Sequence, residues 1–475
     1  MTYDAVPLIP RAVLFGNPTY AAPAISPDGT RLGYLAPDEG VLNVFVGPVD
    51  DPTAARPVTH DRGRGVRVFG FCHDDRTLFY LQDDGGDENW RLHLLDLASG
   101  TEECVTPWDD VQVGVIGHNR WHPTTMLLRI NKDNVELFDV WQLDLESRRI
   151  EKVLDNPGNF VGWIVDSDLR VRGGSAMTED GGQELYLGDD TASDSGEFRL
   201  WKTVPSEDTA GTGILGFSRD GRTLYYVSSI EANASRLIAV DLGSGTETVL
   251  AADDAYDVSG VELDPETRVP QAAIFEKDRN EWVFLDPELE ATVSRLRTAL
   301  GAAGAPDGEL GITRPERSDR IWQVSVMPSD GPVHYYVYDR APEGPGSAPA
   351  LRFLFVHKPD LADYELAPME PFTFTARDGL ELHGYLTFPP GVERTALPAV
   401  LNVHGGPWAR DSWGYHPEAQ WLANRGYVSV QVNYRGSTGY GKAFGNAGDK
   451  EWGRAMHTDL LDALEHLVEN GVVDR

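Results

Sequence analysis

The chain has 475 residues, 41% of them hydrophobic, which predicts a globular protein long enough for two domains. Its 75 Asp and Glu residues outnumber its 41 Lys and Arg residues, which gives a net charge of −34 at pH 7. Such a charge repels phosphate backbones and anionic lipid head groups, so we expect no nucleic-acid partner and no membrane partner.

The first residues, MTYDAVPLIPR, lack the basic segment and apolar core of a secretory signal. No apolar run approaches the ~18 residues that a membrane-spanning helix requires. These features favour a cytoplasmic protein. The two cysteines, Cys72 and Cys104, are too few for a disulfide framework or a zinc site in a chain of this length, so we expect buried apolar side chains.

A unit of about four short strands recurs from about residue 23 to about residue 355. Its clearest copies are FSRDGRTLYYV at 217 with RLIAVDLGSGTETVLA at 236, and FCHDDRTLFYL at 71 with RLHLLDLASGTEECVT at 91. The turn signals lie 44 to 53 residues apart, at 26, 73, 122, 166, 218, 264 and 317. Four strands per period with Asp-Gly and Ser-Gly turns predict a β-propeller, here with seven blades. The alternative, a large all-β sandwich, does not require repeats of this period.

His118 and His122 lie four residues apart within the repeats and could share a helix face. A metal site there is disfavoured, because no carboxylate pattern accompanies the two histidines. We therefore expect neither a metal nor another cofactor.

The pattern changes after residue 355. FTFTARDGLELHGYLTFPPG, from residue 372, predicts a hairpin across Asp378 and Gly379, and LPAVLNVHGG predicts a buried parallel strand because it is apolar on both faces. A helix in HPEAQWLANRGY, a second buried strand in VSVQVNYRG and a helix in MHTDLLDALEHLVENG follow. Strand, helix, strand and helix in this order indicate the opening half of a doubly wound α/β sheet.

The stretch LNVHGGPWARDSW, residues 401–413, carries the clearest chemical signal. A short apolar strand runs into His404-Gly405-Gly406-Pro407 and stops at a bulky aromatic residue, which is typical of a loop that binds an oxyanion. When a serine attacks a carbonyl group, backbone N–H groups must already point at the oxygen, and glycine permits that close approach. The alternative is a tight turn without a catalytic role.

Three long segments resemble the prolyl oligopeptidase family of serine peptidases, in its acylaminoacyl-peptidase and dipeptidyl-aminopeptidase-like branch. They are LIPRAVLFGNPTYAAPAISPDGTRLGYLAP, GDENWRLHLLDLASGTEECVTP and HGGPWARDSWGYHPEAQWLANRGYVSVQVNYRGSTGYG. The resemblance implies an all-β seven-bladed propeller, residues 23–355, that caps an α/β-hydrolase domain. Residues 1–22 would pack near the hydrolase domain, and residues 356–475 would be its N-terminal half.

The resemblance also implies roles for the loop. Gly406 would supply one backbone donor to the oxyanion, with Gly405 shaping the turn. His404 precedes these glycines and is not expected to be the base of a catalytic triad. His404 is instead a candidate for contact with the substrate, together with Pro407 and Trp408. Arg435 is expected to be a structural anchor.

No serine of the chain has the Gly-x-Ser-x-Gly spacing of a nucleophile elbow, because GGSAM at 173, GFSRD at 216 and RGSTG at 435 all depart from it. In the family the elbow follows the helix that ends EHLVENGVVDR, and the Asp and His come later. We therefore expect the triad beyond Arg475 and an inactive chain when it is alone. The strand LPAVLNV would then have an open edge that a C-terminal hydrolase segment covers.

The expected function is that of a serine peptidase that hydrolyses short aminoacyl or acylaminoacyl peptides, with the propeller excluding folded proteins. An acyl-ester hydrolase on the same scaffold and a non-catalytic propeller scaffold are the alternatives. The pattern leaves the oligomeric state open.

Overall fold

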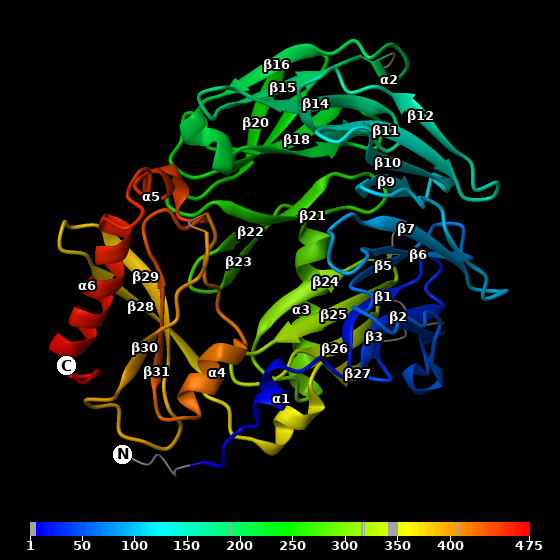
Figure 1. Ribbon diagram of the computed structural model, residues 1–475. Coiled ribbons are helices and arrows are strands. Elements are labelled where there is room, and N and C mark those ends of the chain that lie inside the picture. Colours follow the sequence, from blue (N-terminus) through cyan, green and yellow to red (C-terminus); the bar gives the residue numbers. More distant parts are fainter. Residues whose placement is uncertain (1–5, 190–191, 315–316, 318, 341–349, 407) are drawn as a thin grey trace.

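The computed structural model describes residues 6–189, 192–314, 317, 319–340, 350–406 and 408–475. Figure 1 shows seven antiparallel sheets that follow one another around a ring, with an eighth sheet beside them. Each of the seven sheets is built from strands that are consecutive in the chain. This arrangement confirms the predicted fold class, a propeller joined to part of an α/β-hydrolase fold.

The first four blades contain four strands each. In chain order these strands are β1 (Ala21–Ile25), β2 (Arg31–Asp38), β3 (Val41–Pro48) and β4 (Arg56–Pro57); β5 (Val68–Phe71), β6 (Thr77–Gln82), β7 (Arg91–Asp96) and β8 (Glu102–Cys104); β9 (Val113–Asn119), β10 (His122–Asn134), β11 (Leu137–Asp144) and β12 (Ile150–Leu154); and β13 (Phe160–Val165), β14 (Val171–Met177), β15 (Gln183–Leu187) and β16 (Arg199–Val204).

The last three blades follow the same plan with one exception in the sixth. Their strands are β17 (Gly213–Phe217), β18 (Thr223–Ser228), β19 (Arg236–Asp241) and β20 (Thr246–Ala251); β21 (Val258–Leu263), β22 (Pro270–Glu276) and β23 (Asn280–Phe284); and β24 (Glu309–Thr313), β25 (Ile321–Met327), β26 (His334–Asp339) and β27 (Ala350–Val356). Short helical segments between strands are η1 (Pro52–Ala54), α2 (Ala192–Ser195) and η2 (Ser206–Gly211).

The same turn closes the first hairpin of the first and fifth blades. Asp28 accepts hydrogen bonds from the Ser26 hydroxyl and the Thr30 backbone, and Asp220 accepts from Ser218 and Arg222 in the same way. The glycine that follows each aspartate has a positive φ, +74° and +69°. A local aspartate turn of this kind explains why the repeat is visible in the sequence.

Apolar clusters fill the spaces between neighbouring blades. Leu35 and Phe71 join the first blade to the second, and comparable clusters occur at each following junction. The last junction closes the ring: Phe355 of β27 packs against Tyr34 of β2, with ring centroids 5.2 Å apart, and stacks on Tyr20 at 4.6 Å. Side-chain packing therefore holds the blades in the ring.

The sixth blade corrects the expectation of four strands in every repeat. Only three strands are present among its described residues, and α3 (Pro287–Ala302) follows them. Asp286 caps this helix through the Glu288 backbone N–H, and its buried Leu289, Val293 and Leu296 pack in the cluster that includes Trp322. Apolar residues at helical spacing behind an N-cap explain the helix.

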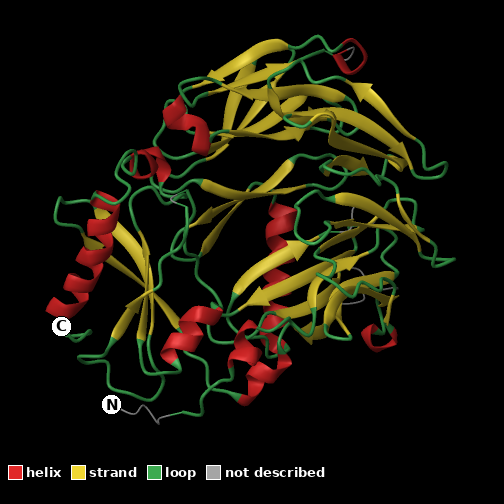
Figure 2. Cartoon of the chain, viewed as in Figure 1, coloured by secondary structure: helices red, strands yellow, loops and turns green. Residues whose placement is uncertain are grey.

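The eighth sheet has the order β28-β29-β31-β30 and belongs to the hydrolase half. Its strands are β28 (Met369–Thr375), β29 (Glu381–Thr387), β30 (Ala399–Leu401) and β31 (Val428–Asn433), and its helices are α4 (Pro417–Ala423), α5 (Gly441–Asn446) and α6 (Ala455–Glu469). In Figures 1 and 2, α6 lies on one side of this sheet and α4 on the other. The strands β30 and β31 are parallel, and β30 is an edge of the sheet.

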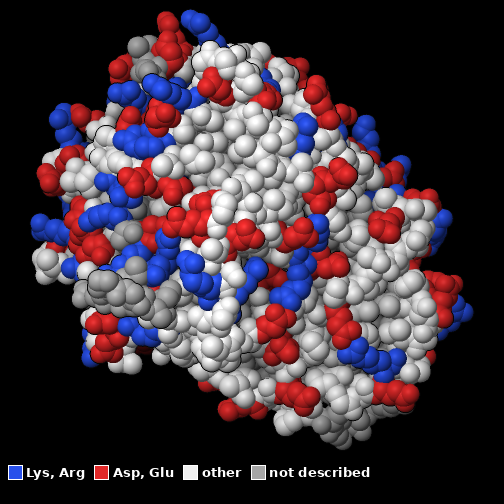
Figure 3. All heavy atoms as spheres, turned by 180° about the vertical axis from the view of Figure 1, so that it is seen from behind, with Lys and Arg blue, Asp and Glu red and all other residues white. Residues whose placement is uncertain are grey.

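Residues before the first blade lie against the hydrolase half. The helix α1 (Arg11–Phe15) contacts α4, and the Ile9 backbone N–H donates to Asn424 Oδ1 at 2.7 Å. Lys358, just before η3 (Pro359–Asp363), donates to the backbone carbonyls of Val13, Leu14 and Gly16. No helix in the described ranges is both long and apolar enough to cross a membrane. On the rear face, acidic and basic side chains are interspersed (Figure 3).

Candidate active site

The loop that begins at His404 crosses the carboxyl ends of β30 and β31. The His404 ring stacks on Tyr434 with ring centroids 4.6 Å apart, and its Nε2 lies 3.0 Å from Ser437 Oγ. The Tyr434 hydroxyl donates to the His404 carbonyl at 3.1 Å. His404 is therefore fixed against the residues that follow β31, and its Nε2 is engaged by a side chain of its own domain.

Gly405 and Gly406 come next, and both are exposed. Gly406 has a φ of +132°, and a Cβ atom there would lie 2.8 Å from the Trp408 nitrogen. At Gly405 a Cβ atom would meet nothing within 4 Å. Position 406 therefore requires glycine, whereas the space around position 405 does not. Pro407, the third candidate for substrate contact, lies outside the described residues.

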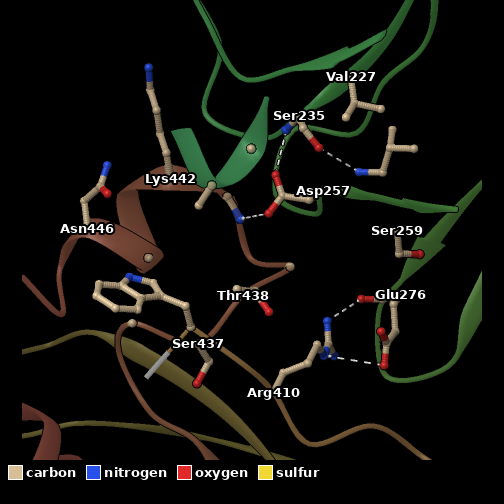
Figure 4. A pocket seen from close by; sticks show the side chains of 18 of the residues that line it. Val227, Ser235, Asp257, Ser259, Glu276, Arg410, Ser437, Thr438, Lys442 and Asn446 are labelled. Carbon is tan, nitrogen blue, oxygen red and sulfur yellow. Dashed lines mark hydrogen bonds and ion pairs between the residues drawn. The ribbon is translucent and has the colours of Figure 1, made fainter. Parts of the chain in front are cut away.

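A cavity of about 230 Å³ lies between the propeller and this part of the hydrolase half (Figure 4). Trp408, 70% exposed, lines the cavity. Gly406 instead borders a separate hollow of about 190 Å³ that Val403, Tyr434 and Trp452 also line, and His404 lines neither. The structure thus divides the predicted loop between two separate spaces.

Asp257, in the propeller wall of the cavity, binds the hydrolase half. Its carboxylate accepts the backbone N–H groups of Ser235 at 2.7 Å and Gly441 at 3.0 Å, as Figure 4 shows. Its own N–H donates to the Gly439 carbonyl at 3.1 Å. Asp257 therefore fastens the residues before α5 to the fifth and sixth blades.

Two further carboxylates line the cavity. Glu276 faces Arg410, with 3.5 Å between Glu276 Oε1 and Arg410 Nε. Glu207, in η2, has a side chain that is 64% exposed and lies 3.5 Å from Lys442 Nζ. Of the three cavity carboxylates, Glu207 is the one most accessible to a ligand.

Arg435, one residue before Gly436 of the cavity wall, joins three elements. It donates to Asp459 of α6 at 2.7 and 2.8 Å, and it pairs with Asp378 of the β28–β29 turn at 2.8 Å. Hydrogen bonds to Asp459, then to Asp378, raise the pKa of the guanidinium. The guanidinium therefore stays charged and holds the start of the 435–446 segment to the sheet and to α6.

Sequence reasoning did not identify Arg410, Asp257 or Glu207. The hydrogen-bond partners that give Arg410 its role are 134 and 133 residues away, and no local pattern connects them. The one available signal is an arginine between Gly406 and Trp413, in a loop where a charged residue needs a partner.

The remaining sequence candidates lie in the propeller. His122 is 3.7 Å from Asp168, and no three His, Cys, Asp or Glu side chains gather as a metal site in the part of the chain that the structure describes. Cys72 is buried as expected, whereas Cys104 is half-buried at the outer strand of its blade. Both thiols are free.

Comparison with known proteins adds a family and a fold. A model of the prolyl oligopeptidase family matches residues 413–475. The chain is 38% identical over 472 residues to dipeptidyl aminopeptidase BIII of Pseudoxanthomonas mexicana, covering 98% of this chain and 66% of that protein. It is 29% identical over 508 residues to dipeptidyl peptidase family member 6 of Caenorhabditis elegans, covering 99% of this chain and 66% of that protein. The chain thus spans 66% of the length of these two curated relatives.

Solved structures show the same fold at lower identity. A puromycin-hydrolyzing peptidase of Mycobacterium tuberculosis has a TM-score of 0.70 and 17% identity, covering 100% of this chain and 75% of its own. A structure from a study of two prolyl endopeptidases has a TM-score of 0.69 and 13% identity, covering 98% of this chain and 69% of its own. The propeller and the partial α/β sheet therefore recur together in other proteins.

Proposed function

Because the chain belongs to the prolyl oligopeptidase family, we propose that it forms the propeller and the oxyanion loop of a serine peptidase that hydrolyses short peptides. The observation that carries the proposal is Gly406, an exposed glycine with a φ of +132° that borders a hollow of about 190 Å³, two residues before Trp408 in the wall of the cavity under the propeller. A backbone N–H held in this way stabilises the charge on a carbonyl oxygen under attack. The propeller would then admit only short peptides to the site.

A segment that follows Arg475 is proposed to supply the serine, histidine and aspartate. Support comes from the edge of the sheet, where Leu397 forms a parallel bridge with Val473 beside β30. Val403 is 46% exposed and Trp452 is 84% exposed next to this edge. A strand continued from residue 473, with the helix behind it, would cover these apolar side chains and bring a nucleophile to the hollow beside Gly406.

The substrate is proposed to carry a free amino terminus. The support is Glu207, an accessible carboxylate in the cavity, which would pair with an ammonium group. The relative in Pseudoxanthomonas mexicana bears the name of an aminopeptidase that acts on dipeptidyl units. A requirement for a free amino terminus on the substrate would also distinguish this enzyme from an acyl-ester hydrolase.

The test uses the protein with the segment that follows Arg475 and three substrates: a dipeptidyl p-nitroanilide, its N-acetylated twin and a p-nitrophenyl acyl ester. We expect preference for the free amino terminus and a KM raised roughly tenfold by Glu207→Gln, with no change from Glu365→Gln on the exposed surface. Hydrolysis of the ester alone would support the esterase. No turnover and no fluorophosphonate labelling would support the non-catalytic scaffold.

The chain of residues 1–475 provides a second test. Because none of its serines lies in a nucleophile elbow, we expect no covalent labelling by a fluorophosphonate probe. A labelled serine found by mass spectrometry would contradict the proposal that the nucleophile lies in the following segment.

A further inference from the structure

The β22–β23 hairpin of the sixth blade reaches across the domain boundary to the loop that carries Gly406. Its tip is formed by residues 277–279. The Tyr385 hydroxyl, from the hydrolase sheet, donates to the Asp278 carbonyl at 3.0 Å. The Arg279 guanidinium lies over the Trp413 ring, 4.1 Å from its centroid. The hairpin is therefore packed against the hydrolase half on both sides of its tip.

Arg410 makes the central contact with this hairpin. Its Nη1 donates to the Glu276 carbonyl at 2.8 Å, and its Nη2 donates to the Lys277 carbonyl at 3.1 Å. Its Nε lies 3.5 Å from the Glu276 carboxylate (Figure 4). The side chain is only 8% exposed, so these bonds form away from bulk water. A planar fork that satisfies two neighbouring carbonyls and a carboxylate is a geometry that lysine cannot reproduce.

The hydrolase half holds the other side of the same guanidinium. Nη2 also donates to the Tyr440 hydroxyl at 3.0 Å, and the guanidinium lies over the Tyr440 ring at 4.5 Å. Gly439 has a φ of +93°, and a Cβ atom there would lie 2.5 Å from Arg410 Nη1. The absence of a side chain at position 439 thus leaves the space that the guanidinium fills.

The residues on either side of Arg410 are held by hydrogen bonds, and the preceding one lies close to Gly406. The Ala409 carbonyl accepts the Thr438 N–H at 3.0 Å, and the Asp411 N–H donates to Asn433 Oδ1 at 2.7 Å. Gly406 lies close to the residue before Arg410, because a Cβ atom at 406 would lie 3.2 Å from the Ala409 nitrogen. A shift of Arg410 would therefore move the N–H of Gly406.

We propose that Arg410 is a positioning residue that fixes the oxyanion loop to the β22–β23 hairpin, so that the propeller sets the orientation of the Gly406 N–H. This inference rests on the proposed function for its catalytic consequence, but the structural link between hairpin and loop does not depend on it. The propeller would then act in the chemical step as well as in limiting access.

The first experiment measures amide hydrogen exchange of residues 404–413 in the chain 1–475, where no activity is needed. Arg410→Met should speed exchange of this loop roughly tenfold or more, because a charge-assisted anchor is lost. Arg394→Met is the matched control, since Arg394 also pairs with a glutamate, Glu370, and lies over an aromatic ring, Phe388, neither of which belongs to the loop. It should leave exchange of residues 404–413 unchanged.

The second experiment measures steady-state kinetics in the protein with the segment after Arg475. Arg410→Met should lower kcat by roughly 10- to 100-fold with little change in KM, because the misplaced donor acts in the transition state. Glu276→Gln removes the carboxylate that faces Arg410 but keeps both hairpin carbonyls, so it should lower kcat less than Arg410→Met does. Arg410→Lys is expected to fold even if Arg410→Met does not. Its kcat should lie between the kcat of Arg410→Met and that of the unchanged protein.

Unchanged exchange in Arg410→Met, or an equal increase in Arg394→Met, would overturn the inference. So would a rise in KM without a fall in kcat, since that result would place Arg410 in substrate binding. If the complete protein hydrolyses no peptide while the loop still loosens in Arg410→Met, the proposed function fails and the structural link between hairpin and loop stands.

Discussion

Two contacts between the hydrolase half and the rest of the chain differ in their chemistry. At the N-terminal contact, Ile9, Leu14 and Leu361 form a buried apolar cluster, and Lys358 donates to three backbone carbonyls at the end of α1. At the loop contact, Arg410 and Lys442 bind hairpin carbonyls and carboxylates of the propeller. Apolar burial supplies stability without a preferred direction, whereas charged hydrogen bonds fix orientation. We therefore expect the first contact to contribute to stability alone and the second to contribute to activity as well as to stability.

The largest expected effect is at the loop contact. Gly406→Val, in the protein with the segment after Arg475, should reduce turnover by about 10²- to 10³-fold, because the side chain forces the backbone from its φ of +132° and moves the N–H donor. Thermal unfolding should show that the fold survives. Gly379→Val, which introduces comparable strain at a φ of +93° in the β28–β29 turn, is the control and should keep its turnover.

The N-terminal contact is tested by Leu14→Ala. Leu14 is 1% exposed, and loss of its side chain should lower the free energy of unfolding by about 3 kcal/mol, measured by urea denaturation. Leu8→Ala, at a position that is 59% exposed, should change it by less than about 0.5 kcal/mol. Faster exchange of the 404–413 loop in Leu14→Ala would contradict the separation of the two contacts.

A smaller effect is expected from Lys442→Met at the loop contact. Lys442 Nζ lies 2.8 Å from the buried Asp208, whose other hydrogen bond comes from Ser229 at 2.8 Å. Removal of the lysine should destabilise the protein by about 2 kcal/mol and reduce the dependence of its melting temperature on salt. Lys450→Met, at an exposed position, is the control. An unchanged salt dependence would show that the loop contact is not ionic.

The smallest effect is a pH dependence at the junction between β27 and the hydrolase half. Burial, then the charges of Lys358 and His334, lowers the pKa of His357 to about 4, and its Nδ1 accepts the Val333 N–H at 2.9 Å. Because the unfolded chain takes up the proton first, stability is fully present above about pH 6.5 and is lost as the pH falls toward 4. Over the first pH unit below 6.5 the loss is at most about 1.4 kcal/mol. As the pH falls over this range, the melting temperature of His357→Gln should decrease less than that of the unchanged protein.

The repeats could be predicted from the sequence because each blade is a local structure. The Asp28 and Asp220 turns lie within a few residues of the strands that they join, so that the pattern shows seven blades. The α3 helix was missed although its signal is local, with an N-cap at Asp286 and apolar residues at helical spacing. The repeat pattern assigned strands to every blade, and this helix departs from it. The repeat pattern alone does not show that the sixth blade has three strands followed by a helix.

The candidate site likewise has one part that the sequence predicts and one part that only the fold shows. His404, Gly405 and Gly406 are adjacent, so their pattern could be identified without a structure. Arg410 and Glu276, by contrast, are 134 residues apart, and only the fold shows that they meet. Contacts between distant segments depend on how the two halves are placed relative to one another, which composition and spacing do not encode.

The closure of the ring by residues from its first and last blades has a consequence for synthesis of the protein on the ribosome. Each blade consists of consecutive strands, so it can form soon after its own residues emerge, with contacts of short sequence separation. Tyr34 of the first blade, however, meets Phe355 only when β27 has been made. Until then its apolar surface has no partner at that junction, and a nascent propeller of six blades exposes a surface that can pair with another chain. We expect chaperones to associate most strongly with nascent chains that end just before β27.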